Sequence, residues 1–159
     1  MNIVLVEPEI PPNTGNIARL CAATRTDLHL IEPLGFELND KRLKRAAMDY
    51  WNQVNWRTWP EWSSFERERK GGQIWLIEST GTHVYSEAEF SESDYFVFGR
   101  ETAGLPEGVL SAHPDHILTI PMFNSESRSL NLSNAVSIVL YEALRQQGFE
   151  GALPLHPRT

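Results

Sequence analysis

Short runs of apolar residues alternate along the chain with longer stretches that repeat apolar positions every three or four residues. The short runs are Asn2–Val6, Leu28–Ile31, Ile74–Glu78, Tyr95–Phe98 and His116–Ile120. Runs of this length are typical of buried strands, and strands that alternate with helices favour a parallel sheet. The pattern therefore predicts an α/β fold, a mostly parallel sheet with helices on both faces.

Capping residues and prolines mark where three helices of the first half begin. The predicted helices run from Asn13 or Thr14 to about Thr24, from Asn39 or Asp40 to about Tyr50, and from Pro60 to Lys70. The prolines before the first of these helices, Pro8, Pro11 and Pro12, are expected to hold an extended loop. No repeat or linker interrupts the pattern, so we expect one domain over residues 1–159 and no separate RNA-binding domain.

The last predicted helix, Leu132 to Gln146, is apolar over more of its surface than a small monomer can cover. Beside its core stripe, Ile138, Tyr141 and Leu144 are apolar on the flank where charge is expected. Two interpretations follow: the domain covers this helix completely, or the helix contacts a second copy in a two-fold dimer.

Composition narrows the class of protein. The only cysteine, Cys21, cannot form an internal disulfide, and its apolar neighbours favour a core position. No stretch approaches the roughly 20 apolar residues that span a bilayer. The chain does not open with a basic, signal-like segment, so a cytoplasmic location is expected.

Charge is distributed unevenly. Residues 1–70 carry ten Lys or Arg and ten Asp or Glu, whereas residues 71–159 carry four and eleven. Lys41, Arg42, Lys44 and Arg45 place four cations within five positions. Such a run is either a solvated helix face or a patch that binds phosphate.

Three polar loops, at residues 79–82, 99–104 and 122–131, each follow a predicted strand. Ligands of open α/β sheets bind beyond the carboxyl ends of strands, so the loops either form a small-molecule site or are ordinary connections. The glycine patterns of Rossmann and P-loop nucleotide sites and the G-x-S-x-G elbow are missing from the sequence, which excludes those classes. His113 and His116 lack a third ligand nearby, so no metal site is expected.

Other residues with chemical potential are predicted to be structural. His29 alternates with apolar residues in its strand, which favours a hydrogen-bonded core histidine over a catalyst. Trp51, Trp56, Trp59 and Trp62 could stack on bases, but their clustering in one amphipathic region favours core and interface.

Three stretches, taken together, carry a resemblance to a known family. They read N-T-G-N-I-A-R at 13–19, F-G-R-E-T-A-G-L-P at 98–106, and I-P at 120–121 followed by S-R-S-L-N-L-S-N-A-V at 127–136. In this order and spacing they resemble the three motifs of the SPOUT superfamily of RNA methyltransferases. The chain is most similar to the YibK (TrmL) group, which 2′-O-methylates the wobble nucleotide of certain leucine tRNAs.

The resemblance, which covers nearly the whole chain, implies a deep trefoil knot in the C-terminal segment. It also implies a homodimer packed through the first and last helices. The methyl donor would be S-adenosylmethionine, without a metal, and the substrate would be the anticodon stem-loop of a tRNA. No membrane or DNA partner is expected.

The resemblance also assigns site residues by motif. The donor site is expected at Ile77, Gly99, Ile120, Met122, Ser129 and Leu130. The catalytic positions are expected at Arg19, Glu101 and Asn131, with Asn13 supporting the first loop. Asn13 is also expected to take part in substrate binding. Phosphates of the tRNA are expected to contact Arg19, Arg25, Lys41, Arg42, Lys44 and Arg45.

The role of Arg19 stays open at this point. No histidine lies in the motifs, and a guanidinium is protonated at physiological pH and is a poor base. Arg19 either fixes a phosphate and stabilises the developing alkoxide, or takes the proton of the 2′-hydroxyl once the complex perturbs it. The chain also departs from the G-P-E-T-R-G-L-P form of motif two at Arg100 and Ala103, and Arg100 is a possible replacement for the missing arginine.

Two alternatives accompany the wobble-methyltransferase hypothesis. The same motifs serve an enzyme that methylates another ribose in tRNA or ribosomal RNA. A dimeric RNA-binding protein without catalytic activity would keep the fold, although the presence of Arg19, Glu101, Ser129 and Asn131 argues against it.

Overall fold

The computed structural model describes residues 1–154, apart from the side chain of Met48. Within this part of the chain, seven strands form one sheet in which every neighbouring pair is parallel. The strands are β1 (Asn2–Val6), β2 (Asp27–Ile31), β3 (Trp56–Trp59), β4 (Ile74–Ile77), β5 (His83–Val84), β6 (Tyr95–Phe98) and β7 (Ile117–Thr119). Their order across the sheet is β3-β2-β1-β6-β4-β7-β5.

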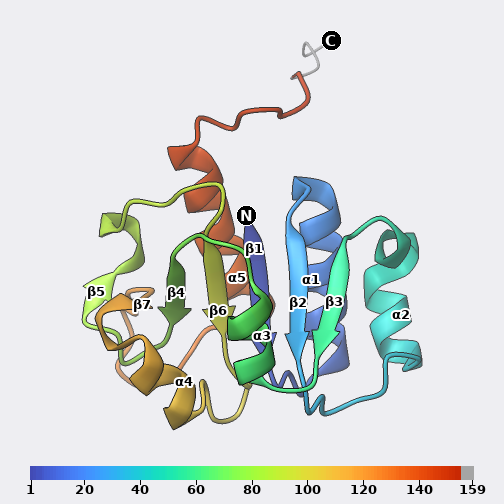
Figure 1. Cartoon of the computed structure of the whole chain (residues 1–159), viewed down its shortest axis with the longest axis horizontal. Coiled ribbons are helices and arrows are strands. Elements are labelled where there is room, and N and C mark those ends of the chain that lie inside the picture. Colours follow the sequence, from blue (N-terminus) through green and yellow to red (C-terminus); the bar gives the residue numbers. More distant parts are fainter. Residues whose placement is uncertain (155–159) are drawn as a thin grey trace.

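Helices cover both faces of the sheet. They are α1 (Pro11–Thr24), α2 (Lys41–Ala47), α3 (Trp62–Glu68), α4 (Glu107–Ala112) and α5 (Leu132–Gln146), with 3₁₀ turns at Met48–Asn52, Tyr85–Glu87 and Pro114–His116. Figure 1 shows α1 and α5 behind the sheet and α3 in front of it. Two apolar clusters follow from the alternation of side chains along the strands, since Ile3 and Leu5 pack towards α1 and α5 whereas Val4 and Val6 pack with Phe65 of α3. The predicted α/β architecture is confirmed.

The start of α1 differs from the prediction. Pro11 and Pro12 occupy the first helical positions after Ile10, where a missing N–H costs no hydrogen bond, and they do not form an extended loop. Asn13 and Thr14 therefore lie inside the helix instead of capping it, and both are buried. This shift frees the side chain of Asn13 for the functional site.

Several other boundaries also differ. The second helix ends at Ala47 and continues as a 3₁₀ turn, and the third begins at Trp62 and ends at Glu68, so Pro60 precedes it. The pattern missed α4 and two edge strands, β3 with its two tryptophans and β5 with only two residues. By contrast, the last helix begins and ends where the pattern predicts, with Asn131 as its cap.

Close packing fixes α2 against α1. A Cβ atom on Gly15 would lie 2.6 Å from Cβ of Ala46 and 2.8 Å from the carbonyl oxygen of Leu43, so only glycine permits this approach. The exposed cations of α2 are thereby held rigidly beside α1.

Of the residues predicted to be structural, Trp59 and Cys21 are buried and His29 is partly buried. Trp59 donates from Nε1 to Nδ1 of His29 at 3.1 Å, and Nε2 of His29 lies 3.3 Å from Oδ1 of Asn2. Burial lowers the pKa of His29 to about 4 and raises the pKa of the fully buried Cys21 thiol to about 12. These contacts confirm His29 as a structural histidine.

No helix within residues 1–154 is long and apolar enough to cross a membrane. The same residues contain no group of three or more His, Cys, Asp or Glu side chains placed to hold a metal ion.

Candidate functional site

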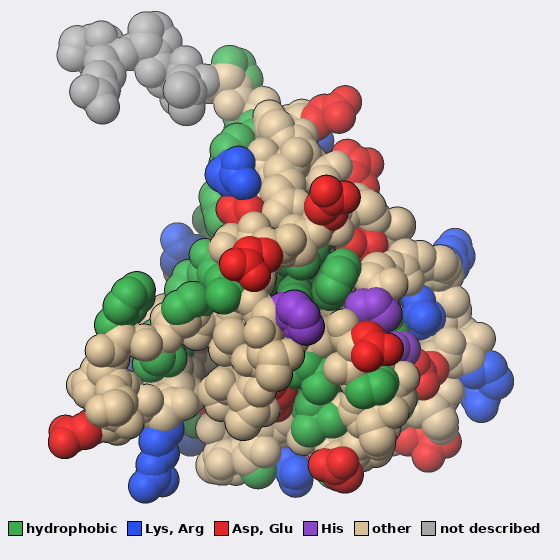
Figure 2. All heavy atoms as spheres, turned by 90° about the vertical axis from the view of Figure 1, so that its left-hand side faces the viewer, with side chains coloured by type: hydrophobic (Ala, Val, Ile, Leu, Met, Phe, Trp, Pro, Cys, Tyr) green, Lys and Arg blue, Asp and Glu red, His purple; other side chains and the backbone are tan. Residues whose placement is uncertain are grey.

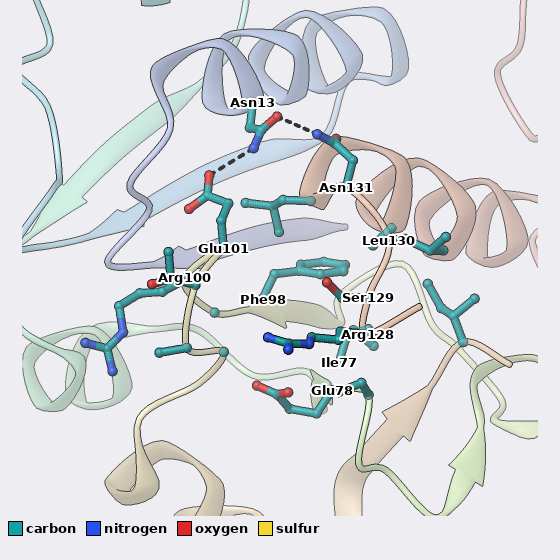
Figure 3. A pocket seen from close by; sticks show the side chains of 18 of the residues that line it. Asn13, Ile77, Glu78, Phe98, Arg100, Glu101, Arg128, Ser129, Leu130 and Asn131 are labelled. Carbon is teal, nitrogen blue, oxygen red and sulfur yellow. Dashed lines mark hydrogen bonds between the residues drawn. The ribbon is translucent and has the colours of Figure 1, made fainter. Parts of the chain in front are cut away.

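A cavity of about 580 Å³ opens at the carboxyl ends of β4 and β6, beside the beginning of α5 (Figure 3). The three polar loops meet here because parallel strands end at the same edge of the sheet. All six residues predicted for the donor site line the cavity: Ile77, Gly99, Ile120, Met122, Ser129 and Leu130. Asn13, Glu101 and Asn131 line it as well.

Gly99 permits the tight path of the loop after β6. A Cβ atom at this position would lie 2.1 Å from the carbonyl carbon of Gly104 and 2.2 Å from the nitrogen of Leu105. The loop closes on itself because Arg100 and Gly104 exchange two backbone hydrogen bonds, of 3.0 and 2.9 Å. Backbone groups of this loop can therefore approach a ligand closely.

Glu101 fastens this loop to the beginning of α1. Its carboxylate accepts hydrogen bonds from the backbone nitrogen of Glu9 at 2.8 Å, the backbone nitrogen of Ile10 at 3.2 Å, and Nδ2 of Asn13 at 3.1 Å. A carboxylate at a helix N-terminus is also stabilised by the helix dipole. Glu101 therefore positions two segments more than 80 residues apart.

Asn13 links this contact to α5. Its Oδ1 accepts from Nδ2 of Asn131 at 3.0 Å, and Oδ1 of Asn131 accepts from the nitrogen of Ser133 at 2.9 Å, which caps α5. Figure 3 shows Asn13 between Glu101 and Asn131. We call these three side chains the polar clasp.

Arg100, the predicted replacement for the arginine missing at Ala103, lines the cavity. Its Nη1 lies 3.4 Å from Oε2 of Glu7, so the two form an ion pair. Ala103 is exposed at the edge of the cavity.

Sequence reasoning missed two charged residues of the cavity. Glu78, which follows β4, accepts a hydrogen bond from the backbone nitrogen of Leu105. Arg128 lies in segment 121–130, every residue of which is exposed. In Figure 3 both side chains point into the cavity. The sequence signal that could have identified them is their position next to two predicted donor-site residues, Ile77 and Ser129.

Arg19 lies elsewhere on the surface of its own chain. It is exposed on α1 and is not among the described residues that line the cavity. Its guanidinium lies 5.1 Å from the centre of the Tyr50 ring. Arg19 follows Asn13 by six positions in the helix, so the two side chains are roughly 120° apart around the helix axis.

The four cations of the 41–45 run are exposed on α2, and Arg25 is exposed just after α1. Arg42 pairs with Asp40 at 3.1 Å, and its hydrogen bonds lower the pKa of that carboxyl group. None of these cations lines the cavity among the described residues, so the basic surface and the cavity are distinct features of one chain.

Residues 1–141 match the model of the SpoU rRNA Methylase family. The chain is 52% identical over 152 residues to the tRNA (cytidine(34)-2′-O)-methyltransferase of Saccharophagus degradans, covering 95% of this chain and 98% of that protein. The chain therefore belongs to the SpoU family of RNA methylases, as its three motifs indicate.

Solved structures agree with this assignment. One, described as giving structural insights into the 2-OH methylation of C/U34 on tRNA, is 44% identical with a TM-score of 0.87, over 94% of this chain and 97% of that chain. The SpoU methyltransferase AviRb from Streptomyces viridochromogenes, in complex with AdoMet, is 26% identical with a TM-score of 0.81. That match covers 96% of this chain and 59% of AviRb.

Proposed function

We propose that this protein transfers a methyl group from S-adenosylmethionine to the 2′-hydroxyl of the wobble ribose of leucine tRNAs. It would act on cytidine(34) and 5-carboxymethylaminomethyluridine(34). The observation that carries the proposal is the convergence of all six predicted donor residues on one cavity, in a chain of this family. The names of the relatives support position 34, and the resemblance to the YibK group supports leucine tRNA. A tRNA substrate supports the cytoplasmic location that we propose.

The cavity fits the methyl donor. Its volume lies in the range of small-molecule sites, and Ile77, Ile120 and Leu130 supply apolar surface for an adenine ring. The backbone beside Gly99 offers hydrogen-bonding groups at close approach. When bound, S-adenosylmethionine supplies a methyl group on a positively charged sulfur. The proposal includes no metal.

The chain must also handle the proton of the 2′-hydroxyl. No histidine lines the cavity among the described residues, and the oxygens of the polar clasp accept hydrogen bonds from within the protein. Glu101 and Asn131 are therefore proposed to hold the reacting loops in place. Arg19 remains the proposed catalytic side chain, and stabilising the developing alkoxide is the role that suits a protonated guanidinium.

A dimer through α1 and α5 would bring Arg19 to a cavity. Tyr141 on α5 is 50% exposed, and Leu20 and Leu144 are half-buried, which leaves apolar surface for a second copy. Because Arg19 does not line the cavity of its own chain, we propose that it serves the cavity of the other protomer.

Mixing two inactive variants tests this arrangement. Arg19→Ala removes the guanidinium, and Ser129→Trp fills the cavity at an exposed position. If Arg19 acts across the interface, a re-equilibrated equal mixture recovers about a quarter of wild-type activity, since half the dimers are mixed and each has one intact site. No recovery, with mixed dimers verified by mass spectrometry, would place Arg19 in the site of its own chain.

We also propose that the C-terminal segment forms a trefoil knot. Segment 120–131 leaves β7 on the far side of β4 and returns to α5, which packs against α1 and β6. Stretching single molecules from both termini tests this: a knotted chain stays shorter than its residue number allows, and an unknotted chain reaches full length.

The exposed cations of α2 are proposed to hold tRNA phosphates. They lie on the same side as Arg19, whereas acidic and basic side chains are intermixed on the side where β5 lies (Figure 2). Lys41→Ala with Arg42→Ala is expected to weaken tRNA binding and flatten its dependence on salt, while donor affinity is unchanged. The matched control is Arg67→Ala with Lys70→Ala, which removes the same charge beside α3 on the other face of the sheet. Equal effects of the two double variants on tRNA binding would contradict the assignment of α2 as the phosphate-binding surface.

Methyl transfer to tRNA that lacks its native 2′-O-methyl groups tests the activity itself. Labelled S-adenosylmethionine is the donor, and nuclease mapping locates the label. Label on the wobble ribose of leucine tRNAs supports the proposal. Label on another ribose would favour the second candidate, which the rRNA description of the family supports. Donor binding without any labelled RNA would point to a missing RNA partner or to a required prior modification. Absence of both donor binding and labelled RNA would favour the non-catalytic RNA-binding protein.

A further inference from the structure

Four charged side chains line the cavity: Glu78, Arg100, Glu101 and Arg128. Protein groups already satisfy two of them. Glu101 accepts three hydrogen bonds, from the backbone of Glu9 and Ile10 and from Asn13, and Arg100 pairs with Glu7. This leaves Glu78 and Arg128 as one negative and one positive group in a partly enclosed space.

Glu78 has spare capacity as an acceptor. One of its oxygens accepts from the backbone nitrogen of Leu105 and lies 2.5 Å from where a Cβ on Gly104 would be. Within residues 1–154 no other hydrogen bond or ion pair involves its carboxylate. A carboxylate offers about four acceptor positions, so most of them face the cavity without a protein donor.

Arg128 has no hydrogen bond and no ion pair with any described residue, and it does not pair with Glu78. In Figure 3 both side chains extend into the cavity, with their charged ends on the same side of the view. Two opposite charges that line one cavity without pairing fit a ligand that carries both signs on neighbouring atoms.

We propose that Glu78 and Arg128 bind the amino-acid end of the methyl donor, Glu78 at its ammonium group and Arg128 at its carboxylate. This inference rests on the proposed function. A charged group that leaves water needs an opposite charge, and the zwitterion of an α-amino acid needs one of each. The planar guanidinium can donate two parallel hydrogen bonds to a carboxylate. A phosphate, by contrast, would be repelled by Glu78.

Ligands that lack parts of the amino-acid end test each contact separately by calorimetric titration. S-adenosylhomocysteine carries both groups, decarboxylated S-adenosylmethionine lacks the carboxylate, and 5′-methylthioadenosine lacks both. The variants are Glu78→Gln, which can still accept from Leu105, and Arg128→Gln. Glu126→Gln is the matched control, since Glu126 is exposed in the same loop and does not line the cavity.

Arg128→Gln is expected to weaken S-adenosylhomocysteine about tenfold and to leave the other two ligands unchanged. Glu78→Gln is expected to weaken S-adenosylhomocysteine and the decarboxylated analogue about tenfold, again without effect on 5′-methylthioadenosine. Equal weakening of all three ligands would overturn the inference, because the residues would then only shape the cavity. Unchanged affinities in both variants would overturn it as well. If the wild-type protein binds none of the three, the proposed function itself fails.

Discussion

The cavity has two walls that satisfy their polar groups in different ways. On the wall beside α1, hydrogen bonds of 3.0 to 3.1 Å within the protein connect Asn13, Glu101 and Asn131 of the polar clasp. On the wall formed by Glu78 and Arg128, two charges remain without a protein ion pair among the described residues. The first wall is preorganised and the second is completed by a ligand. Substitutions in the first should therefore lower stability, and substitutions in the second should lower affinity.

The largest effect is expected at Gly99. Gly99→Ala places a methyl group within 2.2 Å of the Gly104–Leu105 backbone, so the loop must move, at about 3 kcal/mol of unfolding free energy or more. Urea unfolding measures this loss, and calorimetry should show that donor binding is lost with it. Gly108→Ala is the matched control, because nothing lies within 4 Å of its added Cβ atom. Similar results for both variants would contradict the close approach.

Breaking the polar clasp should cost less. Glu101→Ala leaves the nitrogens of Glu9 and Ile10 and the amide of Asn13 without their acceptor, which is expected to lower the unfolding free energy by about 2 to 3 kcal/mol. Thermal or urea unfolding provides the measurement. Glu126→Ala removes the same charge from an exposed loop and should be near neutral. If Glu101→Ala leaves the protein as stable as wild type, the two walls do not differ.

Mild acid is expected to lower the unfolding free energy through His29, which belongs to neither wall of the cavity. The pKa of His29 lies at about 4 in the folded protein, below its ordinary 6.5, so the unfolded chain binds more protons between these values. Stability is therefore full above pH 6.5 and falls as the pH drops towards 4, by about 2 kcal/mol between pH 7 and pH 5. Urea midpoints at the two pH values measure the fall. His29→Gln should reduce this dependence, and an unchanged slope would rule out His29 as its source.

The smallest effect is expected at Arg100. Arg100→Gln removes a partly exposed ion pair with Glu7, which is expected to change stability by less than about 1 kcal/mol and to leave donor affinity unchanged. A tenfold loss of S-adenosylhomocysteine affinity would show instead that Arg100 takes part in ligand binding despite its ion pair with Glu7.

The sequence pattern correctly predicted helices and strands that are determined by local sequence signals. Helix α5 begins at a capping asparagine and keeps an apolar stripe to its end, and β6 is a continuous apolar run, so both were placed at their observed bounds. Strand β3 was missed because its two tryptophans suit a core helix as well as a strand, and only pairing with β2 decides between them. Asn13 was misread as a cap because α1 begins two residues earlier, at Pro11, and the hydrogen bond of Asn13 to Glu101, 88 residues away, leaves no local signal.

The candidate site shows the same division. The six residues that the resemblance places at the donor all line the cavity. Ile77, Gly99 and Ile120 lie at or just after the ends of strands that share one edge of the sheet, and Ser129 and Leu130 directly precede α5. The sequence did not single out Glu78 and Arg128. They are recognised only in the structure, because the other two charged residues of the cavity have protein partners there. The position of Arg19 away from its own cavity likewise depends on the register of α1, which no local pattern reports.

The burial of Cys21 has a practical consequence for labelling this protein at a chosen site. A thiol with no exposed surface and a pKa of about 12 carries almost no thiolate near neutral pH, so maleimides and oxidants have nothing to attack in the folded chain. A cysteine introduced on segment 121–130 would then be the sole reactive thiol, with no native residue replaced to silence the background. A fluorophore at that position would report the loop's response to each ligand directly.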